Sequence, residues 1–457
     1  MIRETRSVCP VCLANIPAVL DQRPDGSVVM TKTCPQHGTW ETTVWRGRLP
    51  FSRWISGTAP LAGSEGLHCP EACGLCSEHV QGSCCVVLEV TERCNLRCRF
   101  CFADAGKNSE PPLTELLDAV QNIAHTASRP MLQLSGGEPT LRNDLPDLIR
   151  AAREAGIPYV QVNTNGIRLA QEPDLAQALA DAGLNFVFLQ FDGTDDRIYR
   201  TLRGRSMLEI KEKAIANSGA AGLGVTLVPT VVPGVNLRIL GDIVKYAADR
   251  SPVVRGVHFQ PVSYFGRVPE NGPVSPEHCT MDELLASLCE QTGLVFTDFV
   301  PSRCDHPLCG FHGSFIAEKG LLIPLTHGNA APRTMITAGE NREFVAKHWL
   351  RQNTELKAEN ASVHTPEQYT AASCRAVNHP LRLPMENSDV TDMDVFLRKV
   401  RSQSFTVSCM PFQDAMNLDA ERLRNCSLHV YRKGKLVPLC AEYLTPVDPA
   451  GRKEEQQ

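Results

Sequence analysis

Three cysteines in one short segment are the residues of this chain best placed to do chemistry. Cys94, Cys98 and Cys101 follow the apolar run Val86–Val90 at the spacing C-x3-C-x2-C. Three thiolates from one loop can hold three irons of a 4Fe–4S cluster and leave the fourth iron without a protein ligand. A catalytic metal needs such an open coordination position. The alternative is a three-cysteine zinc or electron-transfer site, which would recruit a fourth ligand from elsewhere in the chain.

A second cysteine segment repeats this spacing upstream. Cys69, Cys73 and Cys76 again form C-x3-C-x2-C, and Cys84 follows them. Because a fourth thiolate is available here, we expect a closed auxiliary 4Fe–4S cluster with Cys84 as its fourth ligand. A structural zinc site is the alternative.

The N-terminal segment offers three thiols and an imidazole. Cys9 and Cys12 form C-x2-C, and Cys34 and His37 form C-x2-H, with the turn signal Asp25-Gly26 between them. Two such pairs joined by a hairpin predict a tetrahedral metal site. Zinc and iron both suit a thiolate-rich tetrahedral site, so both remain open.

The C-terminal half carries four further candidate ligands. Cys304 and Cys309 form one pair, and Cys426 and Cys440 lie on either side of the strand-like run Leu428–Leu439. The four could converge on another auxiliary cluster. Buried free thiols are the alternative, because nothing in the spacing forces convergence.

The elements that must position these residues alternate in type along the middle of the chain. Predicted strands are Val86–Val90, Met131–Leu134, Tyr159–Asn163, Phe186–Phe191, Val225–Val232 and Val257–Pro261. Predicted helices are Leu113–Ala127, Leu145–Ala155, Asp174–Ala182, Met207–Ser218 and Asn236–Ala248. Alternating units of this kind imply a parallel sheet with right-handed crossovers. We therefore expect an α/β fold with a partial (β/α)6 barrel, whose chemistry lies at the carboxyl ends of its strands.

Polar and glycine residues follow three of the predicted strands. Gly136, Gly137 and Glu138 follow the second strand, where the glycines let the backbone approach a ligand and the carboxylate can bind an ammonium group. The next two strands end in Asn163–Gly166 and Gln190–Gly193. Each segment taken singly is typical of an ordinary turn. As an ordered series they predict a ligand-binding rim.

The cysteine loop and the Gly-Gly-Glu segment together resemble the radical S-adenosylmethionine (SAM) superfamily. The resemblance implies that the open iron binds the methionine part of SAM, and that electron transfer splits SAM to a 5′-deoxyadenosyl radical that abstracts hydrogen. It also implies that the backbone at Phe100 meets the adenine. The other residues it places at the cofactor or substrate are Gly136, Gly137, Glu138, Asn163, Asn165, Gln190 and Asp192.

The order of motifs over nearly the whole chain is more specific. Cys-Pro-x-Cys, Cys-Pro-x-His-Gly, Cys-Pro-x-x-Cys-Gly-Leu-Cys and Thr91–Cys94 resemble the group of the archaeal tetraether lipid synthase, also described as pterin methyltransferases. Phe259–Val262, Gly266-Arg267 and Asp419–Arg422 fit the same group. This resemblance implies a rubredoxin-like N-terminal site, one or two auxiliary 4Fe–4S clusters, and carbon–carbon bond formation or alkylation on a lipid-like substrate.

The alternatives are a radical methylase acting on a pterin or another small molecule, a peptide maturase, and a non-enzymatic multi-cluster electron-transfer protein. We expect an electron donor such as ferredoxin or flavodoxin. The expected division is a rubredoxin-like or zinc-ribbon-like module at 1–62, an auxiliary cluster segment at 63–85 and the partial barrel at 86–270. A C-terminal auxiliary cluster domain at 271–445 and a flexible tail at 446–457 would complete the chain.

Composition and charge argue against several classes of protein. The 457 residues are 42% hydrophobic and 21% charged, which is typical of a globular protein and not of a disordered one. The net charge of −5 argues against a general nucleic-acid binder. The N-terminus lacks the apolar core of a signal peptide, and no apolar run reaches the roughly 18–20 residues of a membrane span. We expect a cytoplasmic enzyme, with peripheral membrane contact possible if the substrate is a lipid.

Overall fold

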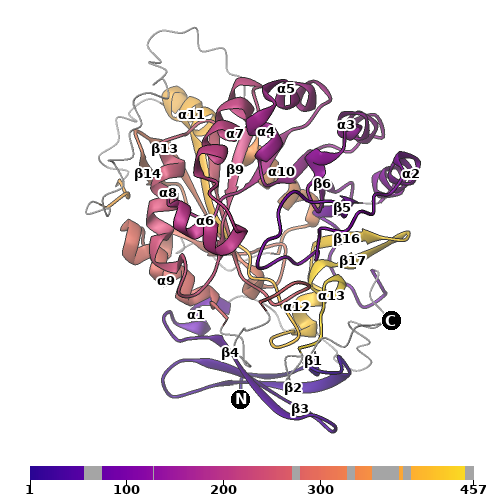
Figure 1. Ribbon diagram of the computed structural model, residues 1–457. Coiled ribbons are helices and arrows are strands. Elements are labelled where there is room, and N and C mark those ends of the chain that lie inside the picture. Colours follow the sequence, from indigo (N-terminus) through magenta and orange to yellow (C-terminus); the bar gives the residue numbers. More distant parts are fainter. Residues whose placement is uncertain are drawn as a thin grey trace.

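The fold comprises a small N-terminal sheet and a large α/β unit (Figure 1). The computed structural model describes residues 1–55, 75–126, 128–269, 278–326, 335–351, 380–383 and 393–447. Cys69 and Cys73 therefore lie outside the described residues, and the expected auxiliary cluster segment is described only from residue 75 onward.

The N-terminal sheet has four antiparallel strands in the order β1-β2-β3-β4. Their bounds are β1 (Arg3–Val8), β2 (Asn15–Gln22), β3 (Val28–Cys34) and β4 (Gly38–Trp45). The predicted hairpin turn is confirmed. Gly26 has a φ of +85°, which a residue without Cβ adopts readily, and the Asp25 carboxylate accepts a hydrogen bond from the Ser27 amide at 2.9 Å. Helix α1 (Phe51–Ile55) follows.

Six parallel strands form the centre of the large sheet, and all six correspond to predicted strands. Within the sheet they lie side by side in the order β5-β6-β7-β8-β9-β11. Their bounds are β5 (Cys85–Thr91), β6 (Met131–Gly136), β7 (Val160–Thr164), β8 (Phe186–Gln190), β9 (Gly224–Val228) and β11 (Val254–Pro261). A two-residue strand, β10 (Thr230–Val231), pairs with the end of β11.

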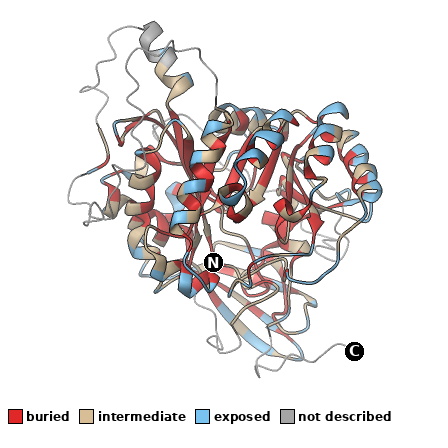
Figure 2. Ribbon diagram, turned by 45° about the horizontal axis from the view of Figure 1, so that its top comes forward, coloured by how far each residue is buried: buried red, intermediate tan, exposed pale blue. Residues whose placement is uncertain are grey.

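Helices cover the outer face of these strands. In Figure 2 the strands are mostly buried, whereas the helices over them are partly exposed. Their bounds are α2 (Leu113–Ala124), α3 (Leu145–Glu154), α4 (Ile167–Gln171), α5 (Pro173–Asp181), α6 (Asp196–Arg203), α7 (Leu208–Ala220) and α8 (Leu240–Ala248). In α2 the predicted apolar positions Leu116, Val120 and Ile123 are buried against the core, which explains why this segment is helical. The short helices α4 and α6 were not among the predicted helices.

The C-terminal segment extends the same sheet at both ends. Strand β15 (Ser404–Cys409) pairs in parallel with β11, and β16 (Leu428–Arg432) pairs in parallel with β5. The strand-like run predicted at Leu428–Leu439 is a hairpin of β16 and β17 (Lys435–Pro438). The boundary expected near residue 270 therefore does not divide two sheets. Edge strands expose unpaired backbone groups, and β15 and β16 cover the edges of the six-stranded centre.

Further strands and helices complete this part of the molecule. Their bounds are β12 (Val300–Pro301), β13 (Phe311–Glu318), β14 (Leu321–Pro324), α9 (Met281–Thr292), α10 (Ala338–Trp349), α11 (Met393–Ser402), α12 (Ala420–Arg424) and α13 (Leu439–Glu442). Trp349, the last residue of α10, packs on Phe188 of β8, with 5.0 Å between ring centroids. None of the described helices is long and apolar enough to cross a membrane.

Candidate active site

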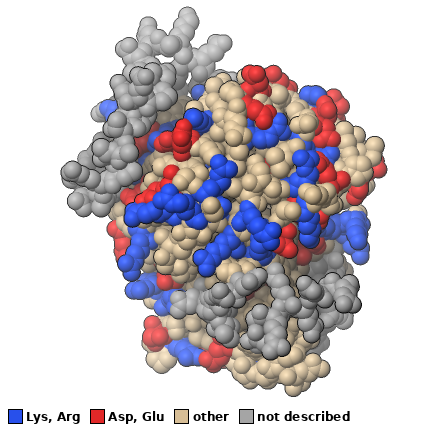
Figure 3. Space-filling view, in the orientation of Figure 1, with Lys and Arg blue, Asp and Glu red and all other residues tan. Residues whose placement is uncertain are grey.

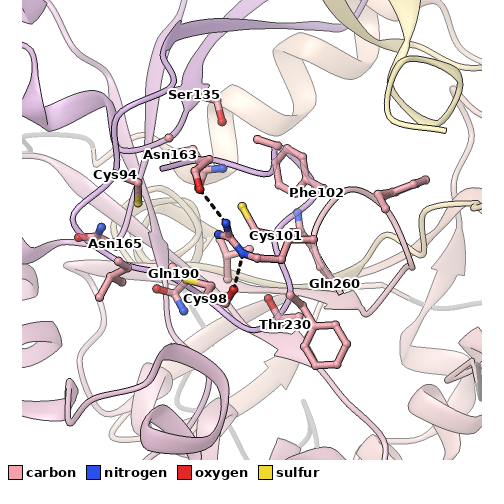
Figure 4. A pocket seen from close by; sticks show the side chains of 18 of the residues that line it. Cys94, Cys98, Cys101, Phe102, Ser135, Asn163, Asn165, Gln190, Thr230 and Gln260 are labelled. Carbon is pink, nitrogen blue, oxygen red and sulfur yellow. Dashed lines mark hydrogen bonds between the residues drawn. The ribbon is translucent and has the colours of Figure 1, made fainter. Parts of the chain in front are cut away.

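A pocket lies where the parallel strands end, as the barrel rule predicts. Figure 4 shows the side chains of Cys94, Cys98 and Cys101 around a common space, with Asn165 and Gln190 beside it. The predicted cofactor-binding residues that line this pocket are Phe100, Gly136, Gly137, Glu138, Asn163, Asn165 and Gln190.

The three loop cysteines meet at this pocket as free thiols. Burial raises the pKa of Cys94 to about 12, and the neighbouring charges of Glu138, Cys98 and Cys101 add to the rise. Three thiolates beside a carboxylate repel one another unless a cation joins them. The set therefore fits a metal cluster, and no fourth thiol lines the described pocket.

The two glycines of the Gly-Gly-Glu segment hold the cysteine loop by backbone contact. The amide of Gly137 donates to the Thr91 carbonyl at 2.7 Å, and the amide of Glu138 donates to the Arg93 carbonyl at 2.8 Å. A Cβ on Gly137 would lie 2.1 Å from the Arg93 oxygen, and one on Gly136 would lie 2.4 Å from the Thr91 oxygen. Only glycine allows this approach. The glycines therefore allow the cysteine loop to lie against this segment, in addition to leaving room for a ligand.

Arg267 ties the other end of the loop. It forms an isolated antiparallel bridge with Cys101, with both amide-to-carbonyl distances at 3.0 Å. Its side chain donates to the Cys98 carbonyl at 3.0 Å and to the Ala105 carbonyl at 2.8 Å. Protein contacts therefore hold the loop with the three thiols at both of its ends.

The Glu138 carboxylate lies buried at the pocket wall, with a relative exposure of 1%. One oxygen accepts from the Thr140 amide at 3.1 Å and from the hydroxyls of Thr140 and Thr164 at 2.6 Å each. The other oxygen accepts from the Asn165 amide at 2.7 Å. This second oxygen keeps acceptor capacity for an ammonium group.

Asp192 does not line the pocket, in contrast to the other predicted residues. Its buried carboxylate forms a two-bond ion pair with Arg203, at 2.7 Å for each bond, and accepts from the Thr230 amide at 3.1 Å. Arg203 lines the pocket instead, and Asp192 positions it. Arg203 was missed because a single arginine at the end of a short helix carries no sequence signal.

Lys211 on α7 is a second buried cation behind this rim. Its ammonium group donates to the Asn165 carbonyl at 2.6 Å and to the Gln190 side chain at 3.2 Å. Burial lowers the pKa of Lys211 to about 7, although the charge of Asp192 opposes the change. It links two predicted cofactor-binding residues without lining the pocket itself.

The N-terminal residues form a compact four-ligand set. The ligand atoms of Cys9, Cys12, Cys34 and His37 all lie within 4.8 Å of one another. The Nδ1 atom of His37 is 3.5 Å from the sulfur atoms of both Cys9 and Cys34. This arrangement fits a tetrahedral metal ion.

Two further groups of described cysteines lie close together. Cys84 packs with Cys304 in one buried cluster, and the Asn341 amide donates to the Cys84 sulfur at 3.3 Å. Burial raises the pKa of Cys426, and the charges of Asp305, Cys440 and Cys309 raise it further. Cys309, Cys426 and Cys440 therefore lie close enough to interact electrostatically. Cys304 was expected with Cys309, Cys426 and Cys440. Burial and then the charges of Asp305 and Cys84 raise the pKa of Cys304, and convergence of the four thiols on one cluster stays a prediction.

Arg422 supplies positive charge to the second group. Its Nε atom lies 3.5 Å from the Cys309 sulfur, and Cys440 is also among the charges that raise the pKa of Arg422. Cys76, half-buried, is the described member of the upstream segment, and its carbonyl accepts from the His79 amide at 2.9 Å. His79 in turn hydrogen-bonds the Cys426 carbonyl at 2.8 Å, so the segment after Cys76 lies against the Cys426 region.

Comparison with known proteins shows to which family this chain belongs. Residues 88–247 match the model of the radical SAM superfamily, and residues 1–46 match the HMPTM N-terminal zinc ribbon domain. The 7,8-dihydro-6-hydroxymethylpterin dimethyltransferase of Methanocaldococcus jannaschii is 32% identical over 477 residues, covering 96% of this chain and 93% of that protein. The chain belongs to the radical SAM superfamily. The predicted resemblance, the α/β fold class and the assignment as an enzyme are confirmed.

Two more distant matches cover less of the chain. A probable GTP 3′,8-cyclase of Methanothermobacter marburgensis is 28% identical over 214 residues, or 46% of this chain and 67% of that protein. The solved structure of methylornithine synthase aligns with a TM-score of 0.37 at 15% identity, over 46% of this chain and 62% of that one.

Membership of the radical SAM superfamily implies a 4Fe–4S cluster and SAM as cofactors. The described residues fit both, because three free thiols share one pocket with a glycine rim and a buried carboxylate. When bound, these cofactors supply a 5′-deoxyadenosyl radical that can take hydrogen from an inert carbon. The chain's own residues hold the cysteine loop and line the pocket, and Glu138 would accept the ammonium group of bound SAM.

Proposed function

We propose that this radical SAM enzyme is a transferase that methylates or otherwise alkylates an unreactive carbon of a pterin-like small molecule. The relative from M. jannaschii carries most of the support, since its name describes dimethylation of 7,8-dihydro-6-hydroxymethylpterin and the match spans both chains. This was the alternative prediction from the sequence. The lipid-like substrate that was expected first has no support in these comparisons.

The lining of the pocket also favours a flat, hydrogen-bonding substrate. Phe102, Phe265 and Phe412 are aromatic residues of the lining, and Gln260 and Asn163 contribute amides. Small-molecule sites commonly combine apolar walls with a few polar groups that fix orientation. Aromatic faces can stack on a heterocycle such as a pterin.

The cysteines outside the radical site would hold further metals. We propose that Cys9, Cys12, Cys34 and His37 bind zinc, as the zinc-ribbon match supports, with iron as the alternative. We also propose an auxiliary cluster at Cys309, Cys426 and Cys440. Cys84 and Cys304 are candidates for another cluster with the upstream segment of Cys69, Cys73 and Cys76.

The test is a reaction of the cluster-loaded enzyme with a reductant, 7,8-dihydro-6-hydroxymethylpterin and SAM in excess, so that one SAM is split to the radical and a second SAM is available as the methyl donor. Wild type should form 5′-deoxyadenosine and a pterin carrying one or two added methyl groups, both measured by mass spectrometry. Cys94→Ala, Cys98→Ala and Cys101→Ala should abolish both products, because each removes a ligand of the radical cluster. Cys289→Ala, in α9 and away from every cysteine group above, should keep them.

Two results would contradict the proposal at different levels. Reductive 5′-deoxyadenosine release by the Cys94→Ala variant would show that the radical cluster is assigned to the wrong thiols. Deuterium transfer into 5′-deoxyadenosine from a labelled lipid extract or peptide, and not from the labelled pterin, would exclude the pterin-like substrate while leaving the radical site in place.

A further inference from the structure

The loop that holds the radical cluster carries an exposed positive surface. Arg97 and Arg99 lie on either side of Cys98, and both side chains are exposed. The amide of Arg99 donates to the Leu202 carbonyl at 3.0 Å, so the loop lies against the end of α6. Arg205, directly after α6, is exposed as well. We name Arg97, Arg99 and Arg205 the arginine surface.

The charge of the arginine surface is not balanced locally. Among the described residues, none of these three arginines has a carboxylate within the 4.0 Å of an ion pair, whereas Arg93 and Arg197 nearby pair with Glu110 and Asp195. Residues 94–101 contain no acidic residue, and residues 196–205 contain one aspartate and four arginines. Figure 3 shows Lys and Arg gathered across the middle of the face that it draws. The whole chain nevertheless has a net charge of −5.

We propose that the arginine surface is the docking site of an acidic one-electron carrier protein. Radical SAM chemistry needs one electron for each SAM that is split, and the carrier is oxidised by one electron as the cluster is reduced. The inference rests on this radical chemistry and not on the substrate of the proposed function. A carrier seated on Arg97 and Arg99 would lie on the same short loop as the three cluster thiols.

Charge complementarity is the reason for an acidic partner. Clustered unpaired charges on one face steer an oppositely charged protein and raise its association rate. They cost the enzyme stability through mutual repulsion unless a partner or solvent offsets them. An uncompensated basic surface on an otherwise acidic chain is therefore best explained by a negatively charged partner at this position.

The experiment uses the cluster-loaded, full-length enzyme and a flavodoxin of strongly negative net charge as the probe. The triple variant Arg97→Gln, Arg99→Gln, Arg205→Gln removes the arginine surface. The control Lys319→Gln, Lys433→Gln, Lys435→Gln removes three exposed charges elsewhere. Binding of oxidised flavodoxin is measured by calorimetry, and cluster reduction by flavodoxin hydroquinone is followed by anaerobic stopped-flow.

The arginine variant should bind flavodoxin at least about tenfold more weakly, and its second-order reduction rate should fall by about 10- to 100-fold at low salt. The rate for wild type should fall with ionic strength more steeply than that of the variant. Dithionite, a small reductant that needs no docking surface, should support equal 5′-deoxyadenosine release by wild type and both variants.

Four outcomes would overturn the docking proposal. The first is an unchanged rate of cluster reduction by flavodoxin in the arginine variant, and the second is an equal loss of that rate in the lysine control. The third is a raised KM for the pterin in the arginine variant with normal flavodoxin binding. The fourth is tight RNA binding by wild type that the arginine variant loses while its flavodoxin binding stays. The third would assign the surface to an anionic substrate and the fourth to a nucleic acid. Failure of the proposed function would instead appear as absent product with dithionite.

Discussion

At the scale of single residues, the site depends on backbone positions as much as on ligating side chains. Gly137 has no functional group, yet its missing Cβ allows the cysteine loop to lie against β6. Gly137→Ala would place a methyl group 2.1 Å from the Arg93 oxygen, so the loop must move. We expect a loss of about 1–3 kcal/mol in the free energy of unfolding. Iron and sulfide analysis should show a depleted radical cluster.

The matched control for this substitution is Gly339→Ala in α10, where the nearest heavy atom to the added Cβ is the Thr337 hydroxyl at 4.0 Å. It should be neutral or slightly stabilising, since alanine is the better helix former. If Gly137→Ala kept full iron content and wild-type stability, the contact between the glycine segment and the cysteine loop would not position the cluster.

At the scale of elements, the sequence predicted the six central strands because each is a short apolar run buried on both faces. It also predicted most of the helices between them from their apolar spacing. It could not predict that β15 and β16 flank this sheet, since those pairings join residues far apart in the chain. The packing of Cys84 near Cys304 could not be predicted for the same reason, because contacts between distant parts of the chain decide which thiols lie close together.

The pairing of β11 with β15 encloses a histidine whose charge state affects stability. His258 contacts the Ser408 hydroxyl at 2.9 Å and packs on Phe188. Burial lowers the pKa of His258 from 6.5 to about 4. Between these values the unfolded chain binds a proton that the folded protein does not, so stability falls as pH decreases from 6.5 to about 4. Below about pH 4 both states are protonated and this loss stops.

His258→Gln should remove this part of the acid sensitivity. Across pH 6.5 to 4, wild type should lose about 3 kcal/mol more unfolding free energy than the variant, measured by urea denaturation at each pH. His125→Gln, at an exposed histidine, should leave the wild-type slope unchanged. Identical slopes for wild type and His258→Gln would mean that His258 is not held neutral by its surroundings.

At the scale of the whole molecule, the N-terminal sheet supports one wall of the radical pocket. Lys32 of β3 donates to the Ala415 carbonyl at 2.7 Å, and Thr42 of β4 donates to the Met416 carbonyl at 3.0 Å. Thr5 of β1 donates to the Asp419 carboxylate at 2.7 Å. The segment thus held, residues 413–419, directly follows Phe412, which lines the pocket. A metal held by Cys9, Cys12, Cys34 and His37 would stabilise the pocket wall through these contacts.

Removing that metal should therefore loosen a segment nearly 400 residues away in sequence. Cys12→Ala is the informative variant. Because Cys12 is exposed, the substitution removes a metal ligand without disturbing the packing of the core. The variant should lack one metal equivalent by elemental analysis and show faster hydrogen exchange at 413–419, with the radical-site iron retained. Glu41→Ala, which removes an exposed ion pair with Arg23 and an exposed hydrogen bond from the Thr31 hydroxyl, should change neither quantity. Unchanged exchange at 413–419 after metal loss would show that the sheet holds this wall without its metal.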